Sequence, residues 1–529
     1  MGETGEISMH DTSYNKIRTV TLTAVLLLFF CAICLINFSA VPSFFDGDMY
    51  CDYRYAMETW EHKSIFPEGW VFGNQLNAVS TPVLAALIYG LTHNLNFSTG
   101  AACTIMAVMA AVCFDWMIKP AFREKESRLA ALTVFVSVSL YCGRAVHGNQ
   151  GWTLLFTMCS YYAGYSMTAF LAFGCYLRGL VGFSRKQLGI LMIACVFSFG
   201  TGIQSIRQTA IMIAPILAVE FFRMGLCFRR WKENRQPLWI AIGLTVCNFL
   251  GLCYVRMREI NQNVIFGAIE LTSPGDLKQA CADCIYMIKD LLGADHPEAF
   301  AILAVLGLAC MLALILILKH VREEQHTIVF FLTLLVLFSV LIIVVIDVFT
   351  TMFVRPRYYF MLYPLMGLLI AYLYDIPRGK VRWILLVLVV LFAAIAGLRQ
   401  LTGICTTVIR HEEEESYEIS RYLLENGYTT LYAEWNFGQD IAVASNGEIA
   451  VGYWTVPERP FEKVSHLCSL DVFESEAEKC AYLFVGEEKA GIGMAAADSA
   501  GVPLQLLRYY PDSDRYLYTA SSNLMQLLS

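Results

Sequence analysis

Long runs of apolar residues recur along the first 400 residues of the chain and are separated by short polar segments. A helix needs about 20 apolar residues to cross the hydrocarbon core of a bilayer. Eleven runs approach or exceed this length, and they cover residues 17–40, 97–118, 129–146, 152–177, 187–206, 209–226, 237–255, 299–318, 328–347, 358–375 and 383–399. The pattern predicts an all-α polytopic membrane domain over residues 1–400, with about eleven transmembrane helices.

The basic residues of the short loops indicate how this domain lies in the membrane, because cytoplasmic loops are enriched in lysine and arginine. A further apolar run, 79–93, would form a helix only about 22 Å long, against a hydrocarbon core of about 30 Å. If this run does not cross and the N-terminus is cytoplasmic, every predicted cytoplasmic loop is basic, namely 119–128, 178–186, 223–235, 319–322 and 378–382. We therefore expect 79–93 to be a juxtamembrane or re-entrant helix on the outer surface.

This topology places four segments outside, namely 41–96, 256–298, 348–357 and everything after about residue 400. The run 17–40 is too long for the core of a signal peptide, and no small-residue cleavage site follows it, so we expect it to be retained. The sequence thus predicts a multi-pass protein of the plasma membrane, with a cytoplasmic N-terminus and an extracytoplasmic C-terminal domain.

Residues 401–529 follow a different pattern, in which short runs typical of strands alternate with helical stretches. A helix over 416–426 is predicted to end at Gly427, because glycine is favoured just after a helix. Strands are predicted within 428–435, 448–454, 481–486, 503–510 and 515–520, with turns at Asn446-Gly447 and Pro511-Asp512. We expect a small soluble α/β domain.

Composition agrees with this division. The chain is 57% hydrophobic and 16% charged, with a mean hydropathy of +0.54, which is more apolar than soluble proteins. No basic segment interleaved with aromatic residues suggests nucleic acid as a partner. Most of the 18 cysteines lie in apolar runs and are expected to behave as small hydrophobic residues. Cys281 and Cys284 could form a local disulfide or stay free, and Cys468 could pair with Cys480.

Polar residues from four separate segments fall on the predicted outer face. They are Asp46, Asp48 and Asp52 after the first helix, Arg144, His147, Asn149 and Gln150 between the third and fourth, Gln204, Arg207 and Gln208 at the tip of a hairpin within 187–226, and Asp347, Arg355 and Arg357 between the ninth and tenth. Carboxylates, a histidine and arginines on one membrane face suit a reaction on a lipid-linked phosphate.

Residue type suggests a role for each candidate. An ionised aspartate can accept a proton from an attacking hydroxyl or hold a divalent cation. Asp48 and Asp46 are therefore candidates for both roles, and His147 is a further catalytic candidate. The planar fork of arginine matches phosphate oxygens, so Arg207, Arg355 and Arg357 are predicted to bind a substrate phosphate.

These residues also have plainer interpretations. Arginines at helix ends often extend to lipid headgroups, and a single interfacial histidine is more often a packing residue than a catalyst. Two aspartates separated by one residue, such as Asp46 and Asp48, often arise by chance. Their position directly after the first helix is therefore the main reason to consider them a site. Asp52 is expected to be a surface residue.

The arrangement resembles the GT-C fold, or C-type, integral-membrane glycosyltransferases, which begin with one helix followed by a long outer loop carrying one or two acidic residues. The matching segments are FDGDMYCDYRYA (45–56), STPVLAALIYGL (80–91) and VRPRYYFMLYPLMGLLIAYL (354–373). The last is similar to an R-Y-x-x-x-x-x-P entry into a late helix of that class. The sequence departs from the pattern where Met49 follows Asp48, and where His147 and Asn149 stand in place of a second acidic motif.

The resemblance implies transfer of a sugar from a polyprenyl-phosphate carrier to a glycan, lipid or protein acceptor on the outer face. It also implies an outer-loop aspartate as base or cation ligand, with Mg²⁺ or Mn²⁺ as the candidate cation. Asp48 matches that position best, and Asp46 is the alternative. A lipid or saccharide transporter or flippase, and a non-catalytic cell-surface membrane protein, are the competing readings. The sequence shows neither an inverted repeat nor broken helices at mid-membrane, which transporters often have.

Overall fold

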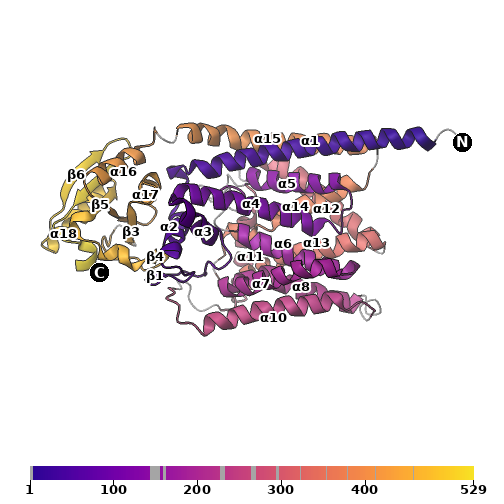
Figure 1. Ribbon diagram of the computed structural model, residues 1–529, viewed down its shortest axis with the longest axis horizontal. Coiled ribbons are helices and arrows are strands. Elements are labelled where there is room, and N and C mark those ends of the chain that lie inside the picture. The colour runs from indigo at the N-terminus through magenta and orange to yellow at the C-terminus, as the bar shows by residue number, and fades with distance from the viewer. Residues whose placement is uncertain are drawn as a thin grey trace.

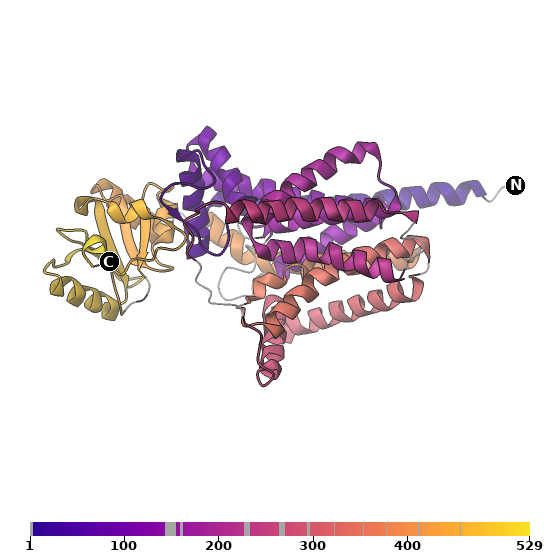
Figure 2. The same ribbon diagram turned by 90° about the horizontal axis from the view of Figure 1, so that it is seen from below.

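Long helices lie side by side in a bundle, and a five-stranded sheet stands at one end of it, opposite the N-terminus (Figure 1). A perpendicular view gives the same arrangement (Figure 2). We call these the sheet end and the far end of the bundle. The computed structural model describes residues 4–142, 155–158, 162–226, 233–263, 270–293, 297–321, 323–352, 354–377, 379–410, 413–454, 456 and 458–528.

Eight helices in the described part of the chain are long and apolar enough to cross a membrane, so the chain is a multi-pass membrane protein. They are α1 (Thr4–Ser39), α4 (Leu95–Ile118), α7 (Leu188–Gln204) with the preceding turn η3 (Arg185–Gln187), α8 (Ile206–Leu226), α10 (Gln236–Arg256), α12 (Pro297–His320), α13 (Glu324–Phe349) and α15 (Lys380–Arg410).

Three further helices occupy the positions of the other predicted spans, but they are not among the eight. They are α5 (Lys125–Cys142), α6 (Ala163–Val181) and α14 (Leu362–Asp375). The span predicted at 152–177 starts too early, because residues 155–158 form a turn and α6 begins at Ala163. The number of about eleven spans is therefore not confirmed.

Two short helices cover the sheet end of the bundle between α1 and α4. After η1 (Pro42–Phe44), α2 runs over Gly47–Glu61, and α3 runs over Thr81–Thr92. At 12 residues, α3 is too short to span, which agrees with the prediction for 79–93. The predicted hairpin within 187–226 is confirmed, because α7 and α8 are separated by Ser205 in an extended conformation. Helix α11 (Leu277–Leu291) lies within the predicted outer segment 256–298, and η4 (Pro356–Tyr359) begins at the end of the predicted outer segment 348–357.

The C-terminal part is built on a sheet of order β3-β2-β5-β7-β6. Its strands are β2 (Thr430–Glu434), β3 (Ala450–Trp454), β5 (Cys480–Val485), β6 (Gln505–Tyr510) and β7 (Arg515–Thr519). Four lie within runs predicted as strands, and β5 begins one residue before its predicted run. The first three pair in parallel and the last two join in antiparallel fashion. The other elements are α16 (Glu415–Glu425), α17 (Gln439–Ala444), η6 (Leu470–Glu474), η7 (Ala477–Lys479), α18 (Glu487–Ser499) and α19 (Leu524–Leu527). Gly427 follows α16 with φ +83°, as predicted.

This C-terminal part is joined to α2 and its loop by backbone pairing and by close contacts. Strand β1 (Trp70–Val71), from the loop after α2, pairs antiparallel with β4 (Cys468–Ser469). The Gly47 N–H donates to Asn436 Oδ1 at 3.1 Å, and the Tyr50 hydroxyl accepts from the Val451 N–H at 2.8 Å. A Cβ at Gly47 would lie 2.7 Å from Asn436 Oδ1, so a larger residue would have to displace the Asn436 side chain and its hydrogen bond.

The predicted boundary at residue 400 falls inside α15, which continues to Arg410. Cys281, Cys284, Cys468 and Cys480 all carry free thiols, so neither candidate disulfide is formed. Cys480 Sγ instead lies 3.1 Å from the Glu476 carbonyl, and Cys468 Sγ lies 3.2 Å from the Val464 carbonyl.

Candidate functional site

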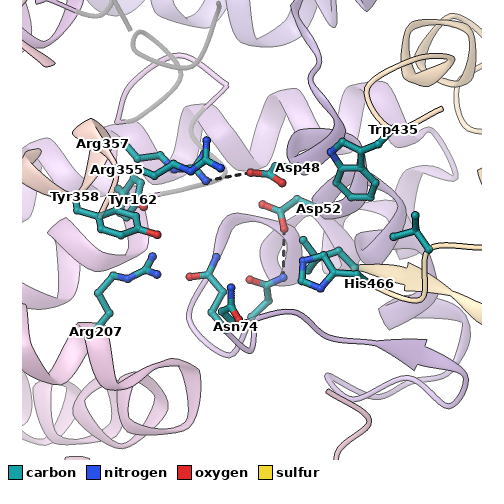
Figure 3. A pocket seen from close by; sticks show the side chains of 14 residues that line it. Asp48, Asp52, Asn74, Tyr162, Arg207, Arg355, Arg357, Tyr358, Trp435 and His466 are labelled. Atoms are coloured by element: carbon teal, nitrogen blue, oxygen red, sulfur yellow. Dashed lines mark hydrogen bonds and ion pairs between the residues drawn. The ribbon is translucent and has the colours of Figure 1, made fainter. Parts of the chain in front are cut away.

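A cavity of about 390 Å³ lies at the sheet end, between the ends of the helices and the C-terminal part (Figure 3). Fourteen residues line it, and twelve of them are polar or aromatic: Asp48, Asp52, Asn74, Gln75, Asn77, Tyr162, Arg207, Arg355, Arg357, Tyr358, Trp435, Val464, His466 and Leu467. Arginines lie on one side, aspartates in the middle, and Trp435 and His466 on the opposite side (Figure 3). A concave site with convergent polar groups is typical of ligand binding.

Helix α2 supplies the two carboxylates of the cavity. Asp48 and Asp52 are four residues apart, so they lie on one face of the helix one turn from each other. Asp46 has a different position, because it is the N-cap of α2 and its Oδ1 accepts the Met49 N–H at 2.8 Å. Its carboxylate satisfies a helix end, and Asp46 is not among the residues that line the cavity.

Three arginines predicted to bind phosphate meet in this cavity from two chain segments. Arg207 comes from the first turn of α8, and Arg355 and Arg357 come from the entry and the body of η4. Arg357 Nη2 lies 3.1 Å from Asp48 Oδ2. The Arg207 guanidinium lies over the ring of Tyr358, 3.9 Å from its centroid, and its buried Nε has no hydrogen-bond partner among the described residues.

Asp52 corrects the sequence analysis, which expected a surface residue. Its Oδ1 accepts a hydrogen bond from Asn77 Nδ2 at 3.2 Å, and it lines the cavity beside Asp48. Burial, and then the negative charge of Asp48, raise the pKa of Asp52 well above the usual value for aspartate. Asp52 follows Asp48 by four residues, and this helical spacing was the signal that could have placed Asp52 in the cavity.

The loop after α2 forms a polar wall and is held by α7. Gln204 accepts the Leu76 N–H at its carbonyl (2.9 Å) and the Val79 N–H at its Oε1 (2.8 Å). Gln208 donates to the Tyr165 carbonyl, so both glutamines that flank Arg207 in the sequence have structural partners. Asn74 in this loop has a buried Oδ1 with no hydrogen-bond partner among the described residues.

The C-terminal part completes the cavity with residues that the sequence did not single out. Trp435 follows β2 directly, and Val464, His466 and Leu467 come from the segment before β4. His466 Nδ1 lies 3.1 Å from the Asn263 carbonyl. Burial lowers the pKa of His466, while this hydrogen bond and Asp48 act in the opposite direction. No local pattern marks these residues, because tertiary docking brings them to the cavity.

Asp347 is described but does not line the cavity. Asp347 accepts the Tyr359 hydroxyl at 2.5 Å, and this hydroxyl also lies 3.2 Å from Cys284 Sγ, so these contacts fix η4 rather than line the cavity. His147 lies outside the described residues, together with Arg144, Asn149 and Gln150.

The contacts of Asp46 and Asp48 bear on the metal role considered for them from the sequence. Asp46 is engaged as a helix cap and Asp48 with Arg357. Among the described residues, no group of three or more His, Cys, Asp or Glu side chains comes together to hold a metal ion. The Mg²⁺ or Mn²⁺ considered for Asp46 and Asp48 stays a prediction, and we derive no step through a metal.

No protein-family model and no curated protein matches the chain. Among solved structures, it is similar to ArnT from Cupriavidus metallidurans bound to undecaprenyl phosphate, with 9% identity and a TM-score of 0.49. The match covers 95% of this chain and 99% of that one. An identity and a TM-score this low identify neither a family nor an activity for the chain.

Proposed function

We propose that the chain is a GT-C-like membrane glycosyltransferase that moves a sugar from a polyprenyl-phosphate carrier to an acceptor at the sheet end of the bundle, on the outer face of the membrane. One observation carries this proposal: Arg207, Arg355 and Arg357 face Asp48 and Asp52 across a cavity at the ends of apolar helices. A lipid-linked phosphate would meet this cavity at the membrane surface, with its chain among the helices.

The arginines suit the phosphate of such a donor. When the sugar is transferred, the bond between its anomeric carbon and the phosphate oxygen breaks, and the electron pair stays on that oxygen. Guanidinium groups placed where this charge develops stabilise the transition state. Arg207 is well suited because stacking on Tyr358 fixes its plane, while its Nε has no partner among the described residues.

The aspartates suit the acceptor. Its hydroxyl oxygen forms the new bond to the anomeric carbon, and its proton must pass to a base. We assign this role to Asp48, which Arg357 orients at 3.1 Å. Asp52 has a raised pKa, so it accepts a proton more readily than an ordinary aspartate and reduces the repulsion between the two carboxyl groups. Asp46, as a helix cap, would act only through the position of α2. A catalytic role of His147 stays a prediction.

Replacing the proposed base tests the function directly. Asp48→Asn should lower sugar transfer from a labelled polyprenyl-phosphate sugar by about 100-fold or more, the usual contribution of a general base. Membrane insertion and the unfolding temperature should not change, because Asn keeps the volume of the side chain. Glu61→Gln, at the exposed end of α2, is the matched control and should retain full activity. Full activity in Asp48→Asn would refute the assignment.

A further inference from the structure

The cavity has two chemically different halves, and the proposed function uses only one of them. Arg207, Arg355 and Arg357 lie on the side of the helices, whereas Trp435 and His466 lie on the opposite side, on the C-terminal part (Figure 3). An arginine half suits a phosphate. An aromatic ring, an imidazole and amide groups suit a neutral, hydroxyl-rich ring.

The hydrogen bond of His466 determines which ring nitrogen carries the proton, and therefore which nitrogen can accept a hydrogen bond from a ligand. The Asn263 carbonyl can only accept, so His466 Nδ1 must carry the proton in the 3.1 Å contact. Burial lowers the pKa of His466, which favours the neutral ring. The Nε2 atom is then left with a free lone pair, and the ring makes no other hydrogen bond to the described residues. A hydroxyl donor is the natural partner of such a group.

The segment that carries His466 is held in a costly conformation. Leu467, which directly follows it, has φ +52°, and Phe461 has φ +72°, in the left-handed region that bulky residues avoid. Strain of this kind persists where the surroundings enforce it, and it concentrates at binding sites. Asn263 enforces it here, because its Nδ2 also donates to the Ser465 carbonyl at 2.8 Å. A Cβ at Gly73 would lie 2.7 Å from His466 Cε1, so the facing loop also packs against the ring.

Trp435 and Asn74 complete this half. The Trp435 ring packs on Tyr453 with centroids 4.9 Å apart, and a Cβ at Gly47 would lie 3.1 Å from its Nε1, so the ring is fixed in place. It stays half-buried, with the remaining surface lining the cavity. Asn74 contributes a buried Oδ1 that lacks a donor among the described residues. A buried acceptor without a donor is costly, and a ligand hydroxyl would satisfy it.

We propose that Trp435, His466 and Asn74 form a binding subsite for a sugar ring, in which the indole covers an apolar face of the ring and His466 Nε2 accepts a hydrogen bond from a sugar hydroxyl. The inference rests on the proposed function only in naming sugar as the ligand of this cavity. The C-terminal part would then select the sugar, whereas the helices bind the phosphate.

Binding of simple glycosides tests the subsite without knowledge of the natural substrates. The full chain in lipid nanodiscs is titrated with methyl glycosides of common hexoses, pentoses and amino sugars, and contact is read by saturation-transfer NMR. We expect a saturable signal for at least one glycoside, and no signal for any of them would overturn the proposal. Binding of undecaprenyl phosphate is measured separately, so its failure would refute the proposed function and leave the sugar subsite standing.

Two variants of His466 separate ligand binding from a structural role. His466→Asn places its amide nitrogen near the position of Nδ1, so it keeps the bond to Asn263 but loses the Nε2 acceptor. His466→Gln places its amide near Nε2 and loses the bond to Asn263. We expect about tenfold weaker glycoside binding in His466→Asn, the loss of one good hydrogen bond, and near-normal binding in His466→Gln. Undecaprenyl phosphate binding should be unchanged in both.

A purely structural histidine would give the opposite order, with His466→Gln the weaker binder, and that result would overturn the proposal. Equal loss in both variants would also overturn it. Glu462→Gln, exposed on the same segment, is the control and should bind like the wild type. Competition with a saturating concentration of the 1-phosphate of the same sugar then shows whether the subsite holds the sugar of the donor or that of the acceptor. The sugar 1-phosphate displaces the glycoside if the subsite belongs to the donor, and the glycoside stays bound if the subsite belongs to the acceptor. Either outcome supports the subsite.

Discussion

Both ends of the helical bundle gather arginines and carboxylates, but they use them in different ways. At the far end, four arginines are each held by carboxylates: Arg18 by Glu126, Arg128 by Asp115, Arg223 by Glu220, and Arg382 by Glu124 and Asp375. At the sheet end, three arginines and two aspartates surround a cavity, and Arg357–Asp48 is the one ion pair that joins these described residues to one another.

The comparison shows that charge at helix ends does not by itself mark a site. The arginines at the far end form ion pairs that hold the helices together, and pairs such as Arg18 and Glu126 are almost fully buried. The cavity arginines line an open volume instead, and the buried Nε of Arg207 has no hydrogen-bond partner among the described residues. Substitutions at the two ends should therefore change different properties, stability at one and ligand binding at the other.

The largest expected effect is on stability at the far end. Arg18→Met would leave the buried Glu126 carboxylate without its cation, and removing one partner of a buried pair costs about 3–5 kcal/mol. The unfolding temperature should fall sharply, while the folded fraction binds undecaprenyl phosphate as tightly as the wild type. Arg459→Met, in an exposed pair with Glu462, should cost less than about 1 kcal/mol. Weaker lipid binding by folded Arg18→Met would break the comparison.

At the cavity, substitutions should weaken ligand binding more than they lower stability. Arg207→Gln removes a guanidinium held over Tyr358, and a hydrogen bond to a charged group is worth about 1.5–3 kcal/mol. We expect the affinity for undecaprenyl phosphate to fall by about 10- to 100-fold, with an unchanged unfolding temperature. Arg508→Gln, an exposed arginine paired with Glu418, serves as the control. A marked loss of stability in Arg207→Gln would show that this arginine is structural, like those at the far end.

Asp52 offers a test by pH. Because its pKa is raised in the folded chain, its contribution to stability is fully present below the ordinary aspartate pKa of about 3.9 and is lost as the pH rises through the raised value. Asn cannot ionise but can still accept the hydrogen bond of Asn77. Asp52→Asn should therefore unfold at a higher temperature than the wild type at neutral pH, and the difference should vanish near pH 3.

Asp498→Asn, on an exposed turn of α18, should show no such pH dependence and is the control. If Asp52→Asn were less stable than the wild type at neutral pH, the carboxylate would be held ionised by the nearby arginines. The sheet end would then resemble the far end, where paired charges stabilise the fold.

The sequence could predict those parts of the site that depend on local pattern. Helix ends, the break at Ser205 and the charge bias of the loops were enough to gather Asp48, Arg207, Arg355 and Arg357 on one face. The five strands were also predicted, because alternation and turn residues act over a few neighbours. The strands and helix ends depend on residues within the same element, whereas the shared face depends on the charge of loops along the whole membrane domain.

What the sequence could not predict depends on tertiary docking. His466 reaches the cavity because β1 pairs with β4 across nearly 400 residues of chain, and no periodicity encodes that pairing. Asp52 was misassigned for a related reason: its exposure depends on the loop that carries Asn77, which folds back over α2. Local charge alone made it look like a solvated residue.

The smallest effect separates the two aspartates at the start of α2, which sequence reasoning treated as alternatives. Asp46 accepts the Met49 N–H as the helix cap, so Asp46→Ala should cost about 1 kcal/mol of stability. Asp46→Asn can still cap the helix, and it should keep both the unfolding temperature and, within about twofold, the rate of sugar transfer. Asp48→Asn makes the same chemical change two residues later and should lower transfer by about 100-fold or more. If Asp46→Asn were as inactive as Asp48→Asn, the carboxylate of Asp46 would have a role beyond capping, and the base would have to be reassigned between them.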